Sequence, residues 1–320
     1  MLPAERTILF TSRAGIGNMA ILRRSGCTNQ GFQSLVVDDC NDTYFIYSMG
    51  DSIKEYAERN ASGSTFLEIS GKQLACMSTM VPSLSEQALI GSFFRDLDDL
   101  ITLHQRKLDH LKLQKRGLLQ KMFPRDGSDG PEIRFPGFTD AWEQRKVSEI
   151  MHRATTFSDD PTLPNVEYED VESGQGLLNK NLLEKAVAKK GLLFEPGDIL
   201  FGKLRPYLKN WLRPAFSGIA VGDWWVLKPD LATSEFLYAF IQGSSFQNIA
   251  NMSTGTKMPR SDWNLVANTE FGIPSEQEEQ ALIGSFFRDL DDLITLHQRK
   301  PDRVSNAVCA LRRVFVACKF

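Results

Sequence analysis

An exact internal repeat constrains the fold of this chain more than any other feature of its sequence. The 22 letters EQALIGSFFRDLDDLITLHQRK occupy residues 86–107 and recur unchanged at residues 279–300, an offset of 193 residues. Solenoid and propeller repeats are only about 20 to 50 residues long, so they do not account for this offset. The repeated unit is a whole domain followed by a helix, and the sequence predicts a tandem duplication.

The repeated segment has the pattern of a coiled-coil helix. From Ile90 onward, ten positions follow alternating steps of four and three residues, and eight of them are apolar. A helix over this span would be about 50 Å long, which matches about 14 to 15 base pairs of DNA. The alternative is an amphipathic helix that lies on its own domain. We expect the second copy to be an antiparallel partner, with these residues at the helix pair: Leu97, Ile101, His104, Leu290, Ile294 and His297.

Between the two helices the composition changes. Residues 125–138, RDGSDGPEIRFPGF, are rich in Gly, Pro and Asp and end the first helix. Beyond them, short apolar stretches at 197–201 and 223–227 predict strands, and residues 234–250 predict a helix. The predicted fold class is α+β. The expected domains are a partial first domain at 1–85, a spacer helix at 86–125, a second domain at 126–278 and a second spacer helix at 279–320.

A weaker repeat extends the duplication into the first 85 residues. In pairs, Ile8–Phe10 matches Ile199–Phe201, Arg13–Asn18 matches Arg205–Asn210, Phe45–Tyr47 matches Phe236–Tyr238, and Ser62–Ser64 matches Thr254–Thr256. Residues 1–85 contain no counterpart of residues 133–192. An incomplete sheet leaves unpaired backbone groups at its edge. We therefore expect the first domain to be only partly folded, and the second domain to be the one that contacts a ligand.

Four segments, in order along the chain, resemble a known family. They are PEIRFPGFTDAWEQRKVSEI at 131–150, GDILF at 197–201, STGTKMPRSDWNL at 253–265, and an Ile-Pro pair at 273–274 that leads through EQ into the long helix. Together they resemble the specificity subunits of type I restriction-modification systems, here with the first target recognition domain truncated at its N-terminal side. The resemblance implies tandem target recognition domains joined by long antiparallel coiled-coil helices. It also implies as partners double-stranded DNA, two methyl-transferring modification subunits and a restriction subunit.

Local positive charge marks where DNA would bind. The net charge is −3, so a DNA site must draw on a local surplus of cations. Residues 180–213 hold eight basic residues and three acidic ones. Lys and Arg contact phosphates and guanine edges, and Asn reads adenine. The candidate DNA-binding residues are Lys203, Arg205, Lys209, Asn210, Thr254, Gly255, Thr256, Lys257 and Arg260, with Arg13 and Asn18 in the first domain.

Catalytic classes find little support in the sequence. A methyltransferase would need a glycine-rich cofactor turn and an Asn-Pro motif, but the chain has no Asn-Pro pair. A nuclease could be imagined from Asp198 and Lys203 near a predicted strand, but the Glu-x-Lys motif that a nuclease needs is absent. The five cysteines form no CxxC pair, which favours reduced thiols over a metal site. We expect no catalytic residue, no cofactor, no metal, no membrane span and a cytoplasmic location.

Two alternatives without DNA reading stay open. The coiled coil could serve only as a scaffold that assembles a complex. Alternatively, the gene could be a silent recombination cassette, because an identical block beside divergent domains is what recombination leaves.

Pro301 predicts a break in the second helix. Proline lacks the backbone N–H and costs about 3 kcal/mol in a helix interior. The second helix is therefore expected to kink or stop there.

Overall fold

The computed structural model describes residues 1–63, 67–125, 128, 130–182, 189–252 and 258–317; within the last helix, the side chains of 299–306, 309 and 313–317 are not described. The chain forms two compact units. Unit 1 comprises residues 1–109 and 295–320, and unit 2 comprises residues 110–294. Two long helices contribute to both units: α4 (Leu84–Lys121) and α9 (Gln277–Ala317). In the part of the chain that is described, no helix has both the length and the apolar character of a membrane span.

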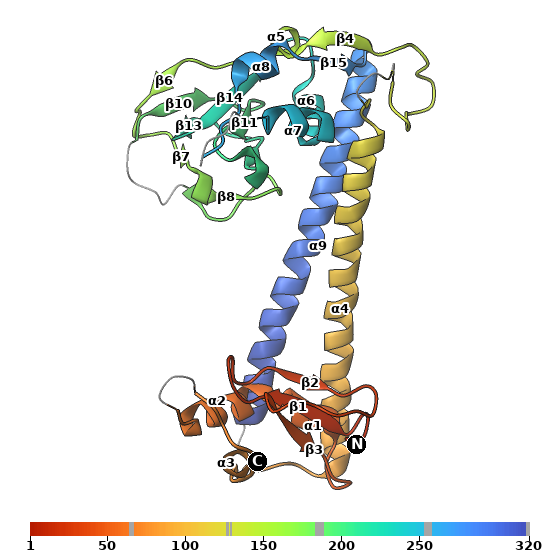
Figure 1. Ribbon diagram of the computed structural model, residues 1–320, viewed down its shortest axis with the longest axis vertical. Coiled ribbons are helices and arrows are strands. Elements are labelled where there is room, and N and C mark those ends of the chain that lie inside the picture. The colour runs from red at the N-terminus through yellow and green to blue at the C-terminus, as the bar shows by residue number, and fades with distance from the viewer. Residues whose placement is uncertain (64–66, 126–127, 129, 183–188, 253–257, 318–320) are drawn as a thin grey trace. The chain divides into compact units, whose positions relative to one another are not determined.

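Among its described residues, unit 1 has a small sheet and short helices beside its parts of α4 and α9 (Figure 1). The middle strand β1 (Thr7–Thr11) pairs antiparallel with β2 (Met19–Ile21) on one side and β3 (Phe32–Val36) on the other. The helices are α1 (Thr43–Ser48), α2 (Gly50–Asn60) and α3 (Gly71–Ala75). Phe10, Ala57 and Ile69 are fully buried between them. The apolar residues of β1 therefore have a core of their own.

Unit 2 is built around a four-stranded sheet in the order β12-β11-β14-β5. Its strands are β12 (Trp211–Leu212), β11 (Ile199–Gly202), β14 (Trp224–Pro229) and β5 (Met151–Arg153). The helices of the unit are α5 (Val147–Ile150), α6 (Ser234–Gln242), α7 (Ser244–Ala250) and α8 (Trp263–Asn268). Phe201, Phe236 and Phe246 belong to the central core, which also takes in Phe287 of α9.

A second sheet of unit 2 has the order β6-β10-β13-β7. Its strands are β6 (Phe157–Ser158), β10 (Gly191–Phe194), β13 (Gly218–Ala220) and β7 (Asn165–Val166). Two strand pairs complete the unit: β4 (Glu143–Lys146) with β15 (Glu270–Ile273), and β8 (Val171–Glu172) with β9 (Leu177–Leu178). The mixture of helices and sheets confirms the predicted α+β class.

The two units share one backbone frame. In unit 1, the amide of Ser12 donates to the carbonyl of Gly31 at 3.0 Å, and the amide of Ile69 donates to the carbonyl of Ser12 at 3.0 Å. In unit 2, the same two bonds join Lys203 to the carbonyl of Asp223 and Ser261 to the carbonyl of Lys203, at 3.0 and 2.8 Å. The β2-β1-β3 sheet corresponds to β12-β11-β14 by this register. The structure thus agrees with a duplicated domain.

The folding of residues 1–85 differs from the expectation. The sequence predicts only partial folding for these residues, but the structure gives them a sheet, three helices and buried side chains. The counterpart of β5 would pair with β3, at the sheet edge, whereas the central strand β1 is paired along both edges and its apolar residues are buried without it.

The long helices run antiparallel within each unit. In unit 1, Asp98 lies 2.5 Å from Arg312, and the His104 and His297 rings are 5.9 Å apart. In unit 2, the Lys115 ammonium lies 2.5 Å from Asp291. Residue numbers fall along α9 as they rise along α4, as an antiparallel pair requires. The prediction that His104 and His297 each face the partner helix is confirmed.

The predicted seam residues lie at these helix pairs. Leu97 and Ile101 pack in unit 1 against a cluster that contains Phe94 and Val308. In unit 2, Ile294 is buried and Leu290 is half-buried. Of the expected kink or stop at Pro301, the stop is wrong, because α9 continues to Ala317, and the kink stays a prediction. Beyond the proline, Val308 is buried and Arg312 pairs with Asp98, and these contacts favour a helical continuation.

A glutamine and a glycine of the repeat attach each helix to its unit. The Gln280 side chain accepts a hydrogen bond from the amide of Thr233 at 3.0 Å and donates to the carbonyl of Pro274 at 3.0 Å. One turn later, a Cβ on Gly284 would lie only 2.5 Å from the Cβ of Glu235. Only glycine lets the start of α6 approach α9 this closely.

The first copy of the repeat makes the same contact. Gln87 accepts from the amide of Asp42 at 3.0 Å and donates to the carbonyl of Pro82 at 2.9 Å. A Cβ on Gly91 would lie 2.9 Å from the amide nitrogen of Phe45. The identical repeats therefore dock two divergent domains in one way.

Replacement of Gly284 by Ala should destabilise unit 2 by about 1–3 kcal/mol, because the added methyl group overpacks a rigid backbone contact. Gly117→Ala is the matched control, since no atom lies within 4 Å of a Cβ built there. Alanine at an unobstructed helix position should stabilise by about 0.5–1 kcal/mol. Thermal unfolding followed by calorimetry measures both, and equal effects of the two variants would contradict the close contact.

Candidate nucleic-acid interface

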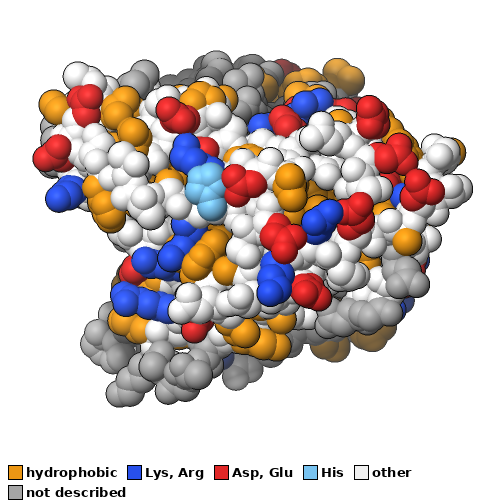
Figure 2. Space-filling view, turned by 90° about the horizontal axis from the view of Figure 1, so that it is seen from above, with side chains coloured by type: hydrophobic (Ala, Val, Ile, Leu, Met, Phe, Trp, Pro, Cys, Tyr) orange, Lys and Arg blue, Asp and Glu red, His pale blue; other side chains and the backbone are white. Residues whose placement is uncertain are grey.

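A cleft of about 470 Å³ opens on unit 2 beside the β5–β14 edge of the central sheet. Residues of β5, β14 and α8 line it together with Lys203, which directly follows β11. An adjoining hollow shares Arg153, Lys203, Trp225 and Trp263 with this cleft and adds residues 260–262 and 264. Figure 2 shows Lys and Arg side chains gathered along a hollow at the left of the view, with hydrophobic side chains beside them.

The loops that carry the cations are fixed by backbone hydrogen bonds. Besides the two bonds of Lys203 described above, the amide of Arg205 donates to the carbonyl of Pro259 at 2.8 Å. Leu204 and Arg260 form a β-bridge across the same two loops. Lys203 and Arg260 are therefore far apart in the sequence, yet they meet on one rigid frame.

A shared carboxylate balances these two cations. Asp223 lies 3.6 Å from the Lys203 ammonium and 3.0 Å from the Arg260 guanidinium. The Arg260 side chain keeps 61% of its surface exposed. One carboxylate for two cations leaves a positive surplus that suits a polyanion.

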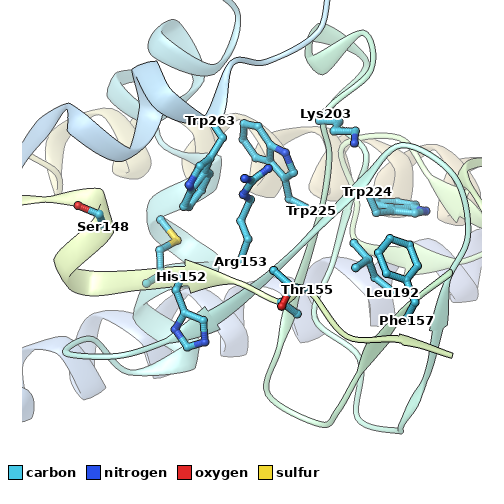
Figure 3. Close-up of a pocket in the computed structure, with 12 residues that line it drawn as sticks. Ser148, His152, Arg153, Thr155, Phe157, Leu192, Lys203, Trp224, Trp225 and Trp263 are labelled. Carbon is cyan, nitrogen blue, oxygen red and sulfur yellow. The ribbon is translucent and has the colours of Figure 1, made fainter.

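Two tryptophans hold a further cation, Arg153 of β5. The guanidinium carbon of Arg153 lies 4.9 Å from the Trp263 ring and 5.9 Å from the Trp225 ring, and the two rings meet at 75° (Figure 3). Partial burial against these rings lowers the pKa of Arg153 from its ordinary value. Guanidinium groups over aromatic faces are stabilised by the ring quadrupole. Nothing in the sequence alone singled out Arg153.

The turn after Lys203 presents its side chains through an unusual backbone. Arg205 and Lys209 both have positive φ angles, 50° and 57°, on either side of the turn Pro206–Leu208. Residues other than glycine seldom adopt this backbone conformation. Lys209 is exposed and Arg205 is half-buried, so both remain candidates for phosphate contact.

Asn210 does not fit the predicted role of an adenine reader. It is only 6% exposed, and its side-chain oxygen accepts a hydrogen bond from the Ser173 hydroxyl at 2.9 Å. The amide of Gly202 donates to its carbonyl oxygen at 2.8 Å. Asn210 therefore holds the turn in place through both its side chain and its backbone.

The remaining predicted residues divide into two groups. Thr254, Gly255, Thr256 and Lys257 lie outside the described residues. Arg13 and Asn18 are exposed in unit 1. The backbone frame keeps the match of Asn18 with Asn210, because the Thr11 and Gly202 amides donate to their respective carbonyls, but it shifts Arg13 by one residue. Ala14, with φ 52°, matches Arg205, so Arg13 corresponds to Leu204.

The basic stretch at 180–213 is less positive than its sequence suggests. Lys180 lies 2.7 Å from Asp170, Lys189 lies 2.8 Å from Glu167, and Arg213 lies 3.1 Å from Glu235. The acids come from other parts of the chain, so the charge count over one stretch of sequence did not include them.

The family profile described as the type I restriction modification DNA specificity domain matches residues 1–113 and 139–306. The chain belongs to this family of specificity subunits. Such subunits are the non-catalytic, DNA-recognising components of type I restriction-modification systems.

Individual relatives agree with this assignment. The chain is 37% identical over 97 residues to the MjaIX specificity subunit of Methanocaldococcus jannaschii, a match that covers 30% of this chain and 22% of that one. It is 20% identical over 293 residues to the MjaVIII specificity subunit of the same organism, covering 83% of this chain and 67% of the relative. The first match thus spans about a fifth of that relative's length.

A solved specificity subunit shares the fold. The S subunit of the type I restriction-modification system from M. genitalium superposes with a TM-score of 0.62 at 14% identity, over 98% of this chain and 83% of that one. The predicted arrangement of α+β domains and long helices is therefore confirmed as that of specificity subunits.

Proposed function

We propose that this chain reads DNA sequence for a type I restriction-modification complex and directs partner modification and restriction subunits to a split DNA site. The observation that carries the proposal is the unit 2 cleft. With its adjoining hollow, the cleft brings Arg153, Lys203 and Arg260 together on a fixed backbone, and the nearby carboxylates of Asp223 and Asp262 are fewer than these cations. Cations position a duplex through its phosphates, and well-placed side-chain donors read its base edges.

The surrounding surface extends this positive region. The turn Pro206–Leu208, in the loop that follows Lys203, is flanked by Arg205 and by the exposed Lys209. In the corresponding turn of unit 1, Gly17 takes the place of Lys209 and Ser12 the place of Lys203. We infer that unit 2 contacts one half-site and that the first unit does not make the same contacts.

The exposed face of the repeat supports docking of modification subunits. Within the repeat, an apolar stripe of exposed side chains recurs at helical spacing: Leu89, Phe93, Leu100 and Leu103. Its second copy also exposes Leu282, Leu293 and Leu296. A repeated apolar stripe on a helix suits a partner helix at each copy. Because the two stripes have identical sequences, we infer that each binds one copy of the same modification subunit.

Removal of the cations around Lys203 should weaken DNA binding. The variant Lys203→Ala, Arg205→Ala, Lys209→Ala should bind duplex DNA more weakly. Its log-log salt dependence should be shallower by up to about 3, because each phosphate that the protein neutralises adds about 0.9 to the slope. Fluorescence anisotropy of the assembled complex at several salt concentrations measures both quantities.

The control removes three cations elsewhere: Lys54, Arg59 and Lys72 of α2 and α3, each to Ala. This control has the same net charge as the Lys203 variant, but it should bind DNA as tightly as the unaltered chain does. Unchanged affinity and salt slope in the Lys203 variant would favour the scaffold hypothesis. A chain that is never expressed in its host would instead fit the silent cassette.

Charge on the apolar stripe should displace modification subunits one at a time. Leu103→Asp and Leu296→Asp each place a carboxylate on one stripe, so each variant should bind one modification subunit and the double variant none. Leu231→Asp is the control, since Leu231 is 52% exposed outside the long helices. Native mass spectrometry counts the bound subunits, and two subunits on the double variant would rule out the stripes as docking sites.

A further inference from the structure

Arg153 differs from the other cations of the cleft in its partners. Lys203 and Arg260 both pair with Asp223. Across the residues that the structure describes, no carboxylate forms an ion pair with Arg153, and its contacts are the faces of Trp225 and Trp263. A cation–π contact uses the charge of a guanidinium without consuming its N–H donors, so these stay available to a ligand.

The position of Arg153 is set by rigid elements. Its backbone lies in β5, where it pairs with Leu227 of β14, and the next amide, Ala154, donates to the carbonyl of Val226 at 2.8 Å. Trp225 is 2% exposed and stacks on Phe201 at 5.6 Å, so the ring beneath the guanidinium belongs to the core. Trp263 begins α8, which Asp262 caps through the amide of Asn264 at 2.8 Å.

The guanidinium of Arg153 is therefore held in place by its strand and by the two rings before any ligand arrives. A side chain that only neutralises phosphate needs no such restraint, and a flexible lysine performs that role well. A planar fork held in one orientation suits a planar pair of acceptors. Guanine presents such a pair, O6 and N7, in the major groove.

We propose that Arg153 is a specificity-determining residue that reads a guanine through a bidentate contact, with Trp225 and Trp263 as the positioning residues. This assignment rests on the proposed DNA-reading function and adds a residue to it. Lys203, Arg205 and Lys209 hold the phosphates, and Arg153 supplies base discrimination at one position of the half-site.

Selection from randomised duplexes tests the proposal. The full chain, assembled with the modification subunit of its own host, is used to select bound DNA, and the preferred motif is read by sequencing. Arg153→Lys keeps the charge but removes the fork. It should reduce discrimination at a single G·C position by about 5- to 150-fold, the range expected when one bidentate base contact is removed, while other positions stay unchanged.

Two further variants make the result specific. Trp263→Leu leaves the charge and fork intact but removes one ring, and it should relax the same position to a smaller degree. Arg145→Lys is the matched control, because Arg145 lies on β4 and pairs with Glu143 at 2.6 Å. It should leave the motif unaltered.

The possible results distinguish failure of base reading by Arg153 from failure of the proposed DNA-reading function. Uniform weakening on all sequences, with no single position relaxed, would identify a phosphate contact and overturn base reading by Arg153. An unchanged motif in Arg153→Lys would overturn it as well. If the unaltered chain selects no motif, the proposed function itself fails, and the assignment fails with it.

Discussion

The structure depends on one contact that the chain makes twice: a buried glutamine and a glycine of each repeated helix against the start of a short domain helix. Gln87 and Gln280 are 1% and 2% exposed, and each satisfies one amide and one carbonyl of its own unit. An unpaired buried amide costs about 1–3 kcal/mol, so these bonds cannot be broken cheaply. The contact explains why 22 identical residues serve two domains whose sequences have diverged.

Buried charge within the helix pairs adds a second constraint. Asp98 and Asp291 are copies of one residue, but different cations from the divergent helix ends neutralise them, Arg312 in unit 1 and Lys115 in unit 2. Burial raises the pKa of Asp291, and the adjacent Lys115 opposes that rise. Both ion pairs are partly buried, so the removal of one partner would weaken the helix pair at that point. The register of each helix pair is thus tied to residues outside the exact repeat.

The sequence predicted the features that local patterns determine. The heptad spacing located α4 and α9, and the apolar stretches located β11 and β14. Features that depend on distant partners were missed. Arg153, Trp225 and Trp263 come from three separate segments, so no window contains the cleft. Asn210 has the chemistry of a base reader, but only the fold shows that it is buried. Pro301 disfavours a helix locally, yet packing farther along α9 outweighs that penalty.

The central claim is that unit 2 reads one half of a split DNA site. The most direct measurement is the methylation pattern of DNA from a host that expresses this chain with its modification subunit. Sequencing that detects methylated adenines should show a two-part motif. Exchange of residues 133–273 for the corresponding residues of another specificity subunit should change one part of the motif and leave the other part and the spacing intact. A motif that stays the same after this exchange, or changes in both parts, would contradict the account.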